Sequence, residues 1–229
     1  MRPRTIVITG ASRGIGHELV LQLAEYSGHR ILALSRNLAK MESDFEDLEN
    51  VSCHALDLSR DDVKEQVESI LLEVDSIDIL INNAGYLVNK PFPEITHEDF
   101  LISYKVNVTG VMETVQAALP KMKQAHIVNV SSVGGYQGSV KFPGLTAYST
   151  SKAALCSFTE LFAEEYKESE VAMNCLCLGA AQTEMLEAAF PGYEAPVTAS
   201  EMAEYIADFA LHANKWMRGK IIPVSLSTP

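Results

Sequence analysis

Residues 5–16 read TIVITGASRGIG, and this stretch decides the fold. Thr5 to Thr9 is a short run of β-branched residues that is typical of a strand. Glycines follow at positions 10, 14 and 16, and from Ile15 to Tyr26 the apolar residues recur at helical spacing. The stretch therefore predicts a strand, a glycine turn and a helix. At such a turn, glycines let backbone amides approach a pyrophosphate group at the positive end of the helix.

The same alternation continues along the chain. Further strands are predicted over 30–35, 51–56, 77–81, 126–131, 171–178 and 221–224, with helices over about 59–74, 96–119, 147–166 and 201–212. Parallel strands need crossover connections, so this pattern predicts an α/β fold with one doubly wound sheet of about seven parallel strands and helices on both faces. No linker or repeat interrupts it, so residues 1–229 are expected to form a single domain.

Composition limits the function classes. A net charge of −12 argues against non-specific binding to nucleic acid or anionic membranes, and no apolar run reaches the roughly 18 to 20 residues that cross a bilayer. We expect a cytoplasmic protein. The four cysteines form no Cys-x-x-Cys pair, and Cys175 and Cys177 would share one strand face and pack in the core. The six histidines lack ligand spacing, so no metal site is predicted.

Four further motifs follow the glycine turn in sequence order. They are Asn82-Asn83-Ala84-Gly85 after the fourth strand, Asn107 in Val-Asn-Val-Thr-Gly, Ser132 after the fifth strand, and Tyr148-x-x-x-Lys152. With the glycine turn, they make nearly the whole chain similar to the short-chain dehydrogenase/reductase family. The resemblance implies a Rossmann-type domain that transfers a hydride between a nicotinamide nucleotide and a small carbonyl or alcohol substrate.

Reduction of a carbonyl group needs a hydride, a proton and a group that stabilises the oxygen. Tyr148 can donate the proton, and Lys152, four residues on along a helix, is expected to lower the pKa of the phenol from about 10 by roughly two to three units. The resemblance implies that Ser132 holds the substrate oxygen, that Asn107 supports a water, and that Lys152 holds the nicotinamide ribose. The serine precedes a glycine by two residues in the family, which favours Ser132 over Ser131.

Each motif also has a plainer interpretation. Tyr86 and Lys90 repeat the Tyr-x-x-x-Lys spacing, but Lys90 precedes Pro91, which disfavours a helix there. Asn107 can equally be a buried polar residue that bonds backbone groups. Residues 83–85 can be only a turn that ends a strand.

The second strand ends in Ser35-Arg36-Asn37, without the acidic residue that binds the adenine ribose of NAD. Arg13 and Arg36 suit a 2′-phosphate, so NADP(H) is predicted over NAD(H). Asp57 resembles the family's adenine-binding aspartate, or it caps a helix. The predicted cofactor-binding residues are Gly10, Ser12, Arg13, Gly14, Ile15, Gly16, Arg36, Asp57, Leu58, Asn83, Ala84, Gly85, Tyr148, Lys152 and Thr183.

The chain departs from the family pattern in two places. Leu178-Gly179 replaces the usual Pro-Gly, although Thr183 matches the nicotinamide contact, and the end of the chain lacks the common Asp-Gly-Gly. Residues 183–200 correspond to a short substrate loop, in which Phe190 and Tyr193 either line a pocket or pack.

The resemblance also implies a homodimer or homotetramer, with the helices after Thr96 and Tyr148 as interfaces. A nucleotide-sensing regulator on the same fold is the alternative from another class. It is disfavoured because all four catalytic positions, Asn107, Ser132, Tyr148 and Lys152, are filled. The substrate and the direction of reaction are not determined by the sequence.

Overall fold

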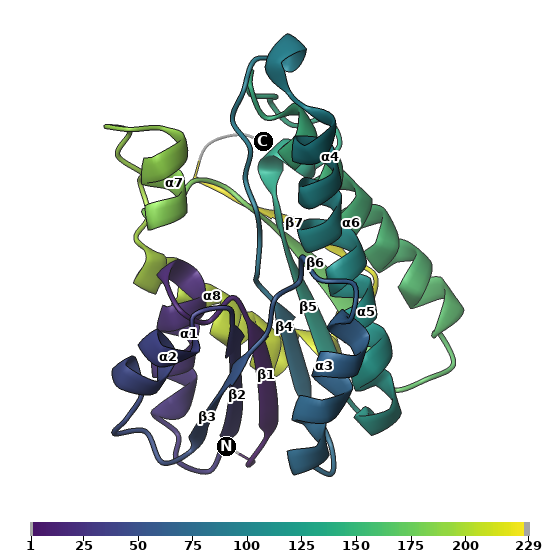
Figure 1. Ribbon diagram of the computed structural model, residues 1–229. Coiled ribbons are helices and arrows are strands. Elements are labelled where there is room, and N and C mark those ends of the chain that lie inside the picture. Colours follow the sequence, from purple (N-terminus) through teal and green to yellow (C-terminus); the bar gives the residue numbers. More distant parts are fainter. Residues whose placement is uncertain (1, 227–229) are drawn as a thin grey trace.

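The computed structural model describes residues 2–226 and contains one seven-stranded sheet (Figure 1). The strands are β1 (Thr5–Thr9), β2 (Arg30–Ser35), β3 (Val51–Ala55), β4 (Ile79–Asn82), β5 (His126–Ser132), β6 (Ala172–Leu178) and β7 (Ile221–Val224). They lie in the order β3-β2-β1-β4-β5-β6-β7, and each neighbouring pair is parallel. The predicted doubly wound parallel sheet is confirmed. The connections change direction between β1 and β4, which opens a crevice at the carboxyl ends of these strands.

Helices cover both faces of the sheet. They are α1 (Gly14–Ala24), α2 (Leu38–Asp44), α3 (Val63–Ile70), α4 (His97–Tyr104), α5 (Gly110–Ala118), α6 (Thr146–Glu165), α7 (Glu184–Ala189) and α8 (Ala199–His212). In Figure 1, α1, α2 and α8 lie on one side of the sheet and α3, α5 and α6 on the other. No helix within residues 2–226 has the length and apolar character needed to span a membrane.

Strand β1 serves the cores on both faces. Ile6 and Ile8 belong to the apolar cluster that contains Leu19 of α1, whereas Val7 belongs to the opposite cluster, with Val115 of α5. This follows from the two-residue period of a strand, which sends alternate side chains to opposite faces. Each fully buried aliphatic side chain contributes about 1.5 to 3 kcal/mol to folding. The apolar side chains of β1 thus pack against helices on both faces of the sheet.

The helix predicted over 96–119 is interrupted. It begins as expected at Thr96, whose side chain and that of Asp99 form a capping box. A π-helical turn then spans Lys105–Thr109 before α5 begins. The wider turn changes the direction of the following side chains, and Asn107 is fully buried within it. The π-helical turn could not be predicted, because its residues fit the pattern of a continuous α-helix.

Other boundaries differ for local reasons. Helix α3 begins at Val63 instead of about Ser59, because the Asp57 carboxylate accepts hydrogen bonds from the backbone amide and hydroxyl of Ser59 and forms a turn first. Helices α2 and α7 were not predicted. They have seven and six residues, too few to show a helical period.

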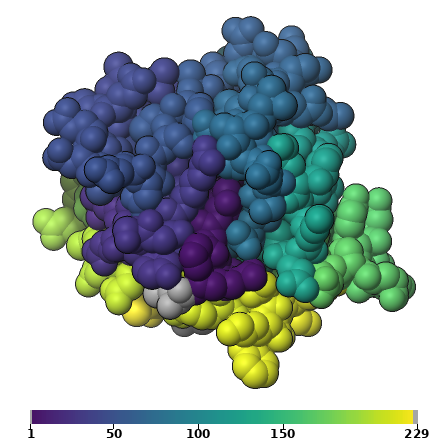
Figure 2. All heavy atoms as spheres, turned by 90° about the horizontal axis from the view of Figure 1, so that it is seen from below, coloured from purple at the N-terminus to yellow at the C-terminus, as the bar shows by residue number. Residues whose placement is uncertain are grey.

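Figure 2 views the molecule from below Figure 1, where β1 begins. The purple N-terminal segment lies beside the yellow C-terminal part of the chain. A hydrogen bond from the Arg4 guanidinium to the Leu211 carbonyl, at 3.1 Å, joins the two. A hollow of about 600 Å³ at this end is lined by Arg2, Arg4 and other polar side chains, and it contains none of the predicted site residues. The predicted site lies at the other end of the sheet.

Candidate active site

A pocket of about 470 Å³ lies at the carboxyl ends of the strands. The glycine turn after β1, the loop after β4 and the ends of β2, β5 and β6 contribute to its wall. Of the predicted site residues, those that line it are Gly10, Ser12, Arg13, Gly14, Ile15, Arg36, Leu58, Asn83, Ala84, Gly85, Ser132, Tyr148, Lys152 and Thr183. Gly16, Asp57 and Asn107 do not line it. The structure therefore brings together segments that are more than 170 residues apart in the sequence.

The glycine turn has no room for a side chain at Gly10 or Gly16. Gly10 has φ +73°, and a Cβ there would lie 2.8 Å from Ala84 Cα. A Cβ on Gly16 would lie 2.2 Å from the Gly10 carbonyl oxygen, and Gly14 has φ +54°. Positive φ and these close approaches require glycine. The turn therefore stays open as a backbone cradle at the start of α1, where the helix dipole is positive.

The loop after β4 is attached to this turn. Asn83 Nδ2 donates to the carbonyl oxygens of Thr9 and Gly10, at 3.2 and 3.3 Å, and the Ala84 amide donates to Thr9 Oγ1 at 3.2 Å. The side chain of Asn83 thus holds the turn in place, while Asn83, Ala84 and Gly85 border the pocket. These hydrogen bonds fix the position of the loop relative to the glycine turn.

Tyr148 and Lys152 lie on the first two turns of α6. Lys152 is 3% exposed, its Nζ donates to the Val130 carbonyl at 2.8 Å, and Nζ lies 5.9 Å from the centroid of the Tyr148 ring. The Ser132 side chain hydrogen-bonds the Tyr148 hydroxyl. A phenol, a hydroxyl and an ammonium group therefore lie together at one wall of the pocket.

The electrostatics of this trio differ from expectation in one respect. Desolvation raises the pKa of Tyr148 to about 12, and the hydrogen bond with Ser132 offsets only part of that rise. The predicted lowering of the phenol pKa by Lys152 is therefore wrong for the protein without nucleotide. Desolvation also lowers the pKa of Lys152 to about 8. Burial disfavours the charged form of each group, and at 5.9 Å from the ring the ammonium does not overcome this.

The two neighbouring serines have different environments. Ser131 is buried, and its hydroxyl donates to the backbone carbonyl of Lys152 at 2.8 Å. Ser132 is half-buried, faces the pocket and accepts from the Gly134 amide at 3.2 Å. Ser131 thus supports the α6 backbone, whereas Ser132 contacts Tyr148.

Asn107 holds the loop that follows Gly85. Its Oδ1 accepts from the Tyr86 amide at 2.7 Å, and its Nδ2 donates to the Tyr86 carbonyl at 2.8 Å and to Ser151 Oγ at 2.9 Å. A Cβ on Gly85 would lie 3.5 Å from Lys152 Nζ and 3.6 Å from Asn107 Oδ1. Asn107 is therefore both a buried residue that bonds backbone groups and a neighbour of the Lys152 ammonium.

Tyr86 and Lys90 do not lie on a helix, as expected from Pro91. Lys90 Nζ pairs with the Asp99 carboxylate at 2.7 Å, while Tyr86 borders the pocket. No helix contains either residue. Tyr86 and Lys90 therefore share the Tyr-x-x-x-Lys spacing but do not lie on one face of a helix.

The part of the pocket wall at the glycine turn and the end of β2 carries positive charge. Arg13 and Arg36 are exposed and line the pocket. The hydroxyl groups of Ser12 and Ser35, which also line it, are hydrogen-bonded to each other at 2.8 Å. Within residues 2–226 neither arginine forms a salt bridge. The two guanidinium groups are therefore available to an anion.

Asp57 has a local role in this structure. Its Oδ1 accepts from the Ser59 amide at 2.9 Å and from the Ser59 hydroxyl at 2.7 Å. These hydrogen bonds, with Arg36 nearby, lower the pKa of Asp57 although burial raises it. Its neighbour Leu58 borders the pocket, so the Asp57 side chain shapes the turn that presents Leu58.

Sequence reasoning missed much of the outer pocket wall. Phe190 and Tyr193 line it, which decides between lining and packing, and Thr183 lines it while capping α7 through a hydrogen bond from the Leu186 amide at 3.2 Å. Lining residues that no motif indicated include Tyr86, Leu87, Val133, Phe142, Leu145, Met185 and Leu186. They come from loops and a short helix, where no periodic pattern marks a shared surface.

The sequence and the fold are similar to those of known proteins. The family described as short chain dehydrogenase matches residues 4–194. The 3-oxoacyl-[acyl-carrier-protein] reductase FabG of Aquifex aeolicus is 33% identical over 194 residues, covering 81% of this chain and 77% of that protein. Dehydrogenase/reductase SDR family member 6 of Xenopus laevis is 30% identical over 187 residues, covering 80% and 73%. The crystal structure of a short chain dehydrogenase from Salmonella enterica serovar Typhi has a TM-score of 0.87 at 27% identity, covering 97% of this chain and 96% of that one.

Proposed function

The chain belongs to the short-chain dehydrogenase family, a family of oxidoreductases, and we propose that it transfers a hydride between NADP(H) and a small carbonyl or alcohol. One observation carries the proposal. Tyr148, Ser132 and Lys152 meet on a wall of the same pocket whose opposite end is the glycine turn. A proton donor and a site for a dinucleotide are thus combined in one cavity, as hydride transfer to a carbonyl requires.

The residues of the pocket fit a nicotinamide dinucleotide. The turn at Gly10 and Gly16 has no space for a Cβ, which keeps backbone amides accessible to a pyrophosphate at the start of α1. When bound, the nucleotide supplies or accepts the hydride. Arg13 and Arg36 would contact the 2′-phosphate that distinguishes NADP(H), and Thr183 would contact the nicotinamide amide.

Three side chains have different roles at the reacting carbonyl group. Tyr148 donates a proton to the carbonyl oxygen during reduction and accepts it during oxidation. Ser132 positions that oxygen and hydrogen-bonds the phenol. Lys152 places positive charge beside the phenol ring and, with a pKa of about 8, exchanges protons near neutral pH. The positive charge of an oxidised nicotinamide would further favour the phenolate over the phenol.

Asn107 acts through other residues. It fixes both backbone polar groups of Tyr86 and lies beside the Lys152 ammonium. We therefore assign it a positioning role, with the support of a water next to Lys152 as a further part of the proposal.

The proposal extends to assembly and location. Leu101 and Tyr104 of α4 and Leu161 of α6 are apolar side chains with exposed fractions of 50%, 38% and 68%. These exposed side chains support a homodimer or homotetramer formed through the helices after Thr96 and Tyr148. A cytoplasmic location is part of the same proposal.

The decisive experiment follows NADPH oxidation against a panel of carbonyl compounds. The panel contains ketones, aldehydes, quinones, sugars and 3-oxoacyl thioesters, the last because FabG of Aquifex aeolicus is named for that substrate. We expect turnover with at least one class and none in the Tyr148→Phe protein. Turnover at an equal rate in both proteins, or binding of NADPH without turnover of any compound, would contradict an oxidoreductase that depends on Tyr148.

A further inference from the structure

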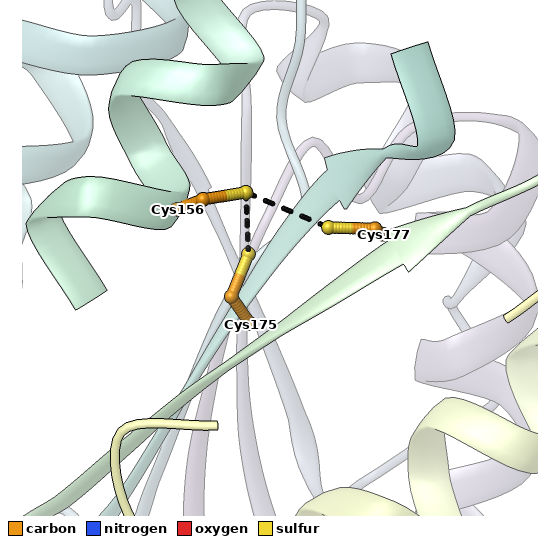
Figure 3. Close-up of side chains that lie close together, drawn as sticks. All are labelled: Cys156, Cys175 and Cys177. Atoms are coloured by element: carbon orange, nitrogen blue, oxygen red, sulfur yellow. Dashed lines mark hydrogen bonds between the residues drawn. The ribbon is translucent and has the colours of Figure 1, made fainter. Parts of the chain in front are cut away.

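Three cysteines from two elements meet beneath the candidate active site (Figure 3). Cys175 and Cys177 project from the same face of β6, and Cys156 projects toward them from α6. Cys156 Sγ lies 3.9 Å from Cys175 Sγ and 3.5 Å from Cys177 Sγ, and all three sulfur atoms lie within 4.8 Å of one another. All three are free thiols.

The cluster is enclosed but lies close to partly exposed side chains. Cys175 and Cys177 are fully buried and Cys156 is 9% exposed. The partly exposed hydrophobic side chains that pack against them are Tyr136 and Ile221. An ion that enters the cluster would exchange its water ligands for sulfur ligands.

The spacing of the sulfurs matches a trigonal metal thiolate. Metal–sulfur bonds are about 2.3 Å long, so three sulfurs arranged in a plane around one ion lie about 4.0 Å apart. The two Sγ–Sγ distances made by Cys156, 3.5 and 3.9 Å, are already near this value.

We propose that Cys156, Cys175 and Cys177 form a binding site for one soft, thiophilic metal ion, of the Cu(I) or Cd(II) type. Thiolates select such ions over hard ones, and three sulfurs without a fourth strong ligand suit them better than Zn(II), which prefers four. For a divalent ion, each metal–sulfur bond forms as the corresponding S–H bond breaks, and the three protons released pass to the solvent. A monovalent ion displaces two of these protons, and the third sulfur binds as a thiol. No oxidant or reductant is required.

The local charge suits this site. Three thiolates around a divalent ion carry one net negative charge, which is costly to bury alone. The ammonium of Lys152 interacts electrostatically with all three cysteines, so it offsets part of that charge. A monovalent ion gives the same net charge of minus one if one of the three sulfurs keeps its proton.

The site adjoins the catalytic helix. Cys156 Sγ lies 3.4 Å from the Lys152 carbonyl oxygen and 3.6 Å from Ser131 Oγ, which itself donates to that carbonyl. An ion bound to the sulfurs would therefore hold the turn of α6 that carries Lys152. We expect occupancy to reduce turnover, an effect that rests on the proposed function, whereas binding itself does not.

The test uses the full chain, reduced and freed of metal, with Cd(II) as the first probe and Cu(I) under anaerobic conditions as the second. Metal retained after desalting is measured by elemental mass spectrometry, the thiolate–Cd(II) absorption is recorded, and X-ray absorption counts the sulfur ligands. We expect one ion per chain bound by three sulfurs. Retention of either ion in this way supports the site, and the two probes show which charge it accepts.

Serine variants provide the controls. Cys156→Ser and Cys177→Ser should each weaken retention at least about a hundredfold, because each removes one of three ligands. Cys53→Ser removes the one cysteine of the chain outside the cluster and should leave retention unchanged. Far-ultraviolet circular dichroism shows whether each variant is folded, and if one of the two cluster variants fails to fold, the other decides.

The inference would be overturned by a folded wild-type chain that retains neither ion. It would also be overturned by fewer than three sulfur ligands, or by cluster variants that bind as well as the wild type. These results would show that the thiols only fill the core. The expectation of no metal site rested on sequence spacing, which does not reveal that α6 brings Cys156 to β6.

Discussion

Lys152 Nζ lies 5.9 Å from the centre of the Tyr148 ring while it donates a hydrogen bond to the Val130 carbonyl. The ammonium is thus anchored to β5 and lies beside the phenol ring. The Ser132 side chain hydrogen-bonds the phenol hydroxyl. Positive charge near the ring and a hydrogen bond at the hydroxyl are therefore supplied by two different residues.

Replacing Tyr148 by phenylalanine removes the proposed proton donor while keeping the ring. Turnover with any substrate found should fall at least about a thousandfold, the loss expected for a general acid. The dissociation constant for NADPH, measured by fluorescence titration, should stay within about twofold, because the remaining pocket is intact. Tyr166→Phe, at the far end of α6 where the ring stacks on Phe162, is the matched control and should keep normal turnover. A Tyr148→Phe protein with wild-type turnover would remove the acid role.

The pH profile of carbonyl reduction should report Lys152. Its pKa is lowered to about 8 by desolvation, so the ammonium is present below pH 8 and lost above it. With NADPH as donor, kcat/KM should be level below pH 8 and then fall, approaching tenfold per pH unit. The residual rate of Lys152→Arg should lack this fall, because a guanidinium group keeps its charge. The same fall in both proteins would mean that another group titrates.

Nucleotide preference should depend on Arg36. Because the guanidinium of Arg36 is exposed, its contact with a 2′-phosphate is screened, and Arg36→Ala should weaken NADPH binding by roughly tenfold, equivalent to about 1.4 kcal/mol. NADH, which lacks this phosphate, should bind within about twofold of its wild-type affinity. Arg60→Ala removes an exposed arginine that pairs with Asp62 and should change neither affinity. The NADP(H) assignment would be contradicted if Arg36→Ala lost the same affinity for both nucleotides. It would also be contradicted if the wild-type protein bound NADPH and NADH equally well.

Stability should fall in mild acid because of His126. This fully buried side chain has Nδ1 2.9 Å from the Ala210 carbonyl and Nε2 3.0 Å from Asn174 Nδ2, so the neutral ring fits and the protonated ring does not. Burial lowers its pKa to about 4. The unfolded chain binds the proton near pH 6.5 and the folded chain only near pH 4. The free energy of unfolding should therefore decrease as pH falls between these values, by up to about 3 kcal/mol.

Urea denaturation at several pH values between 7.5 and 4.5 measures this decrease. His126→Gln, which carries no titrating ring, should show a smaller pH dependence than the wild type. His212→Gln, at an exposed position at the end of α8, should match the wild type. Identical pH profiles for His126→Gln and the wild type would assign the acid sensitivity to other groups.

Several parts of the site could be predicted because their signals are local. The glycine spacing marks a turn in which Gly10 needs positive φ, and the run from Thr5 marks the strand before it. The four-residue spacing of Tyr148 and Lys152 on a helix places both on one face. The pKa of Tyr148 could not be predicted, because it depends on how much water the surrounding loops exclude.

Residue order and periodicity by themselves determined the parallel sheet and the glycine turn after its first strand, since strands, helices and turns are specified by neighbours a few positions apart. The candidate reactive side chains came from the family resemblance. Only the packed structure decided that Asn107 holds Tyr86, that the apolar loops close the outer pocket, and that Cys156 meets Cys175 and Cys177. These contacts join segments that are far apart in the chain. Their geometry is set by how helices and loops fill space against the sheet, which no local pattern encodes.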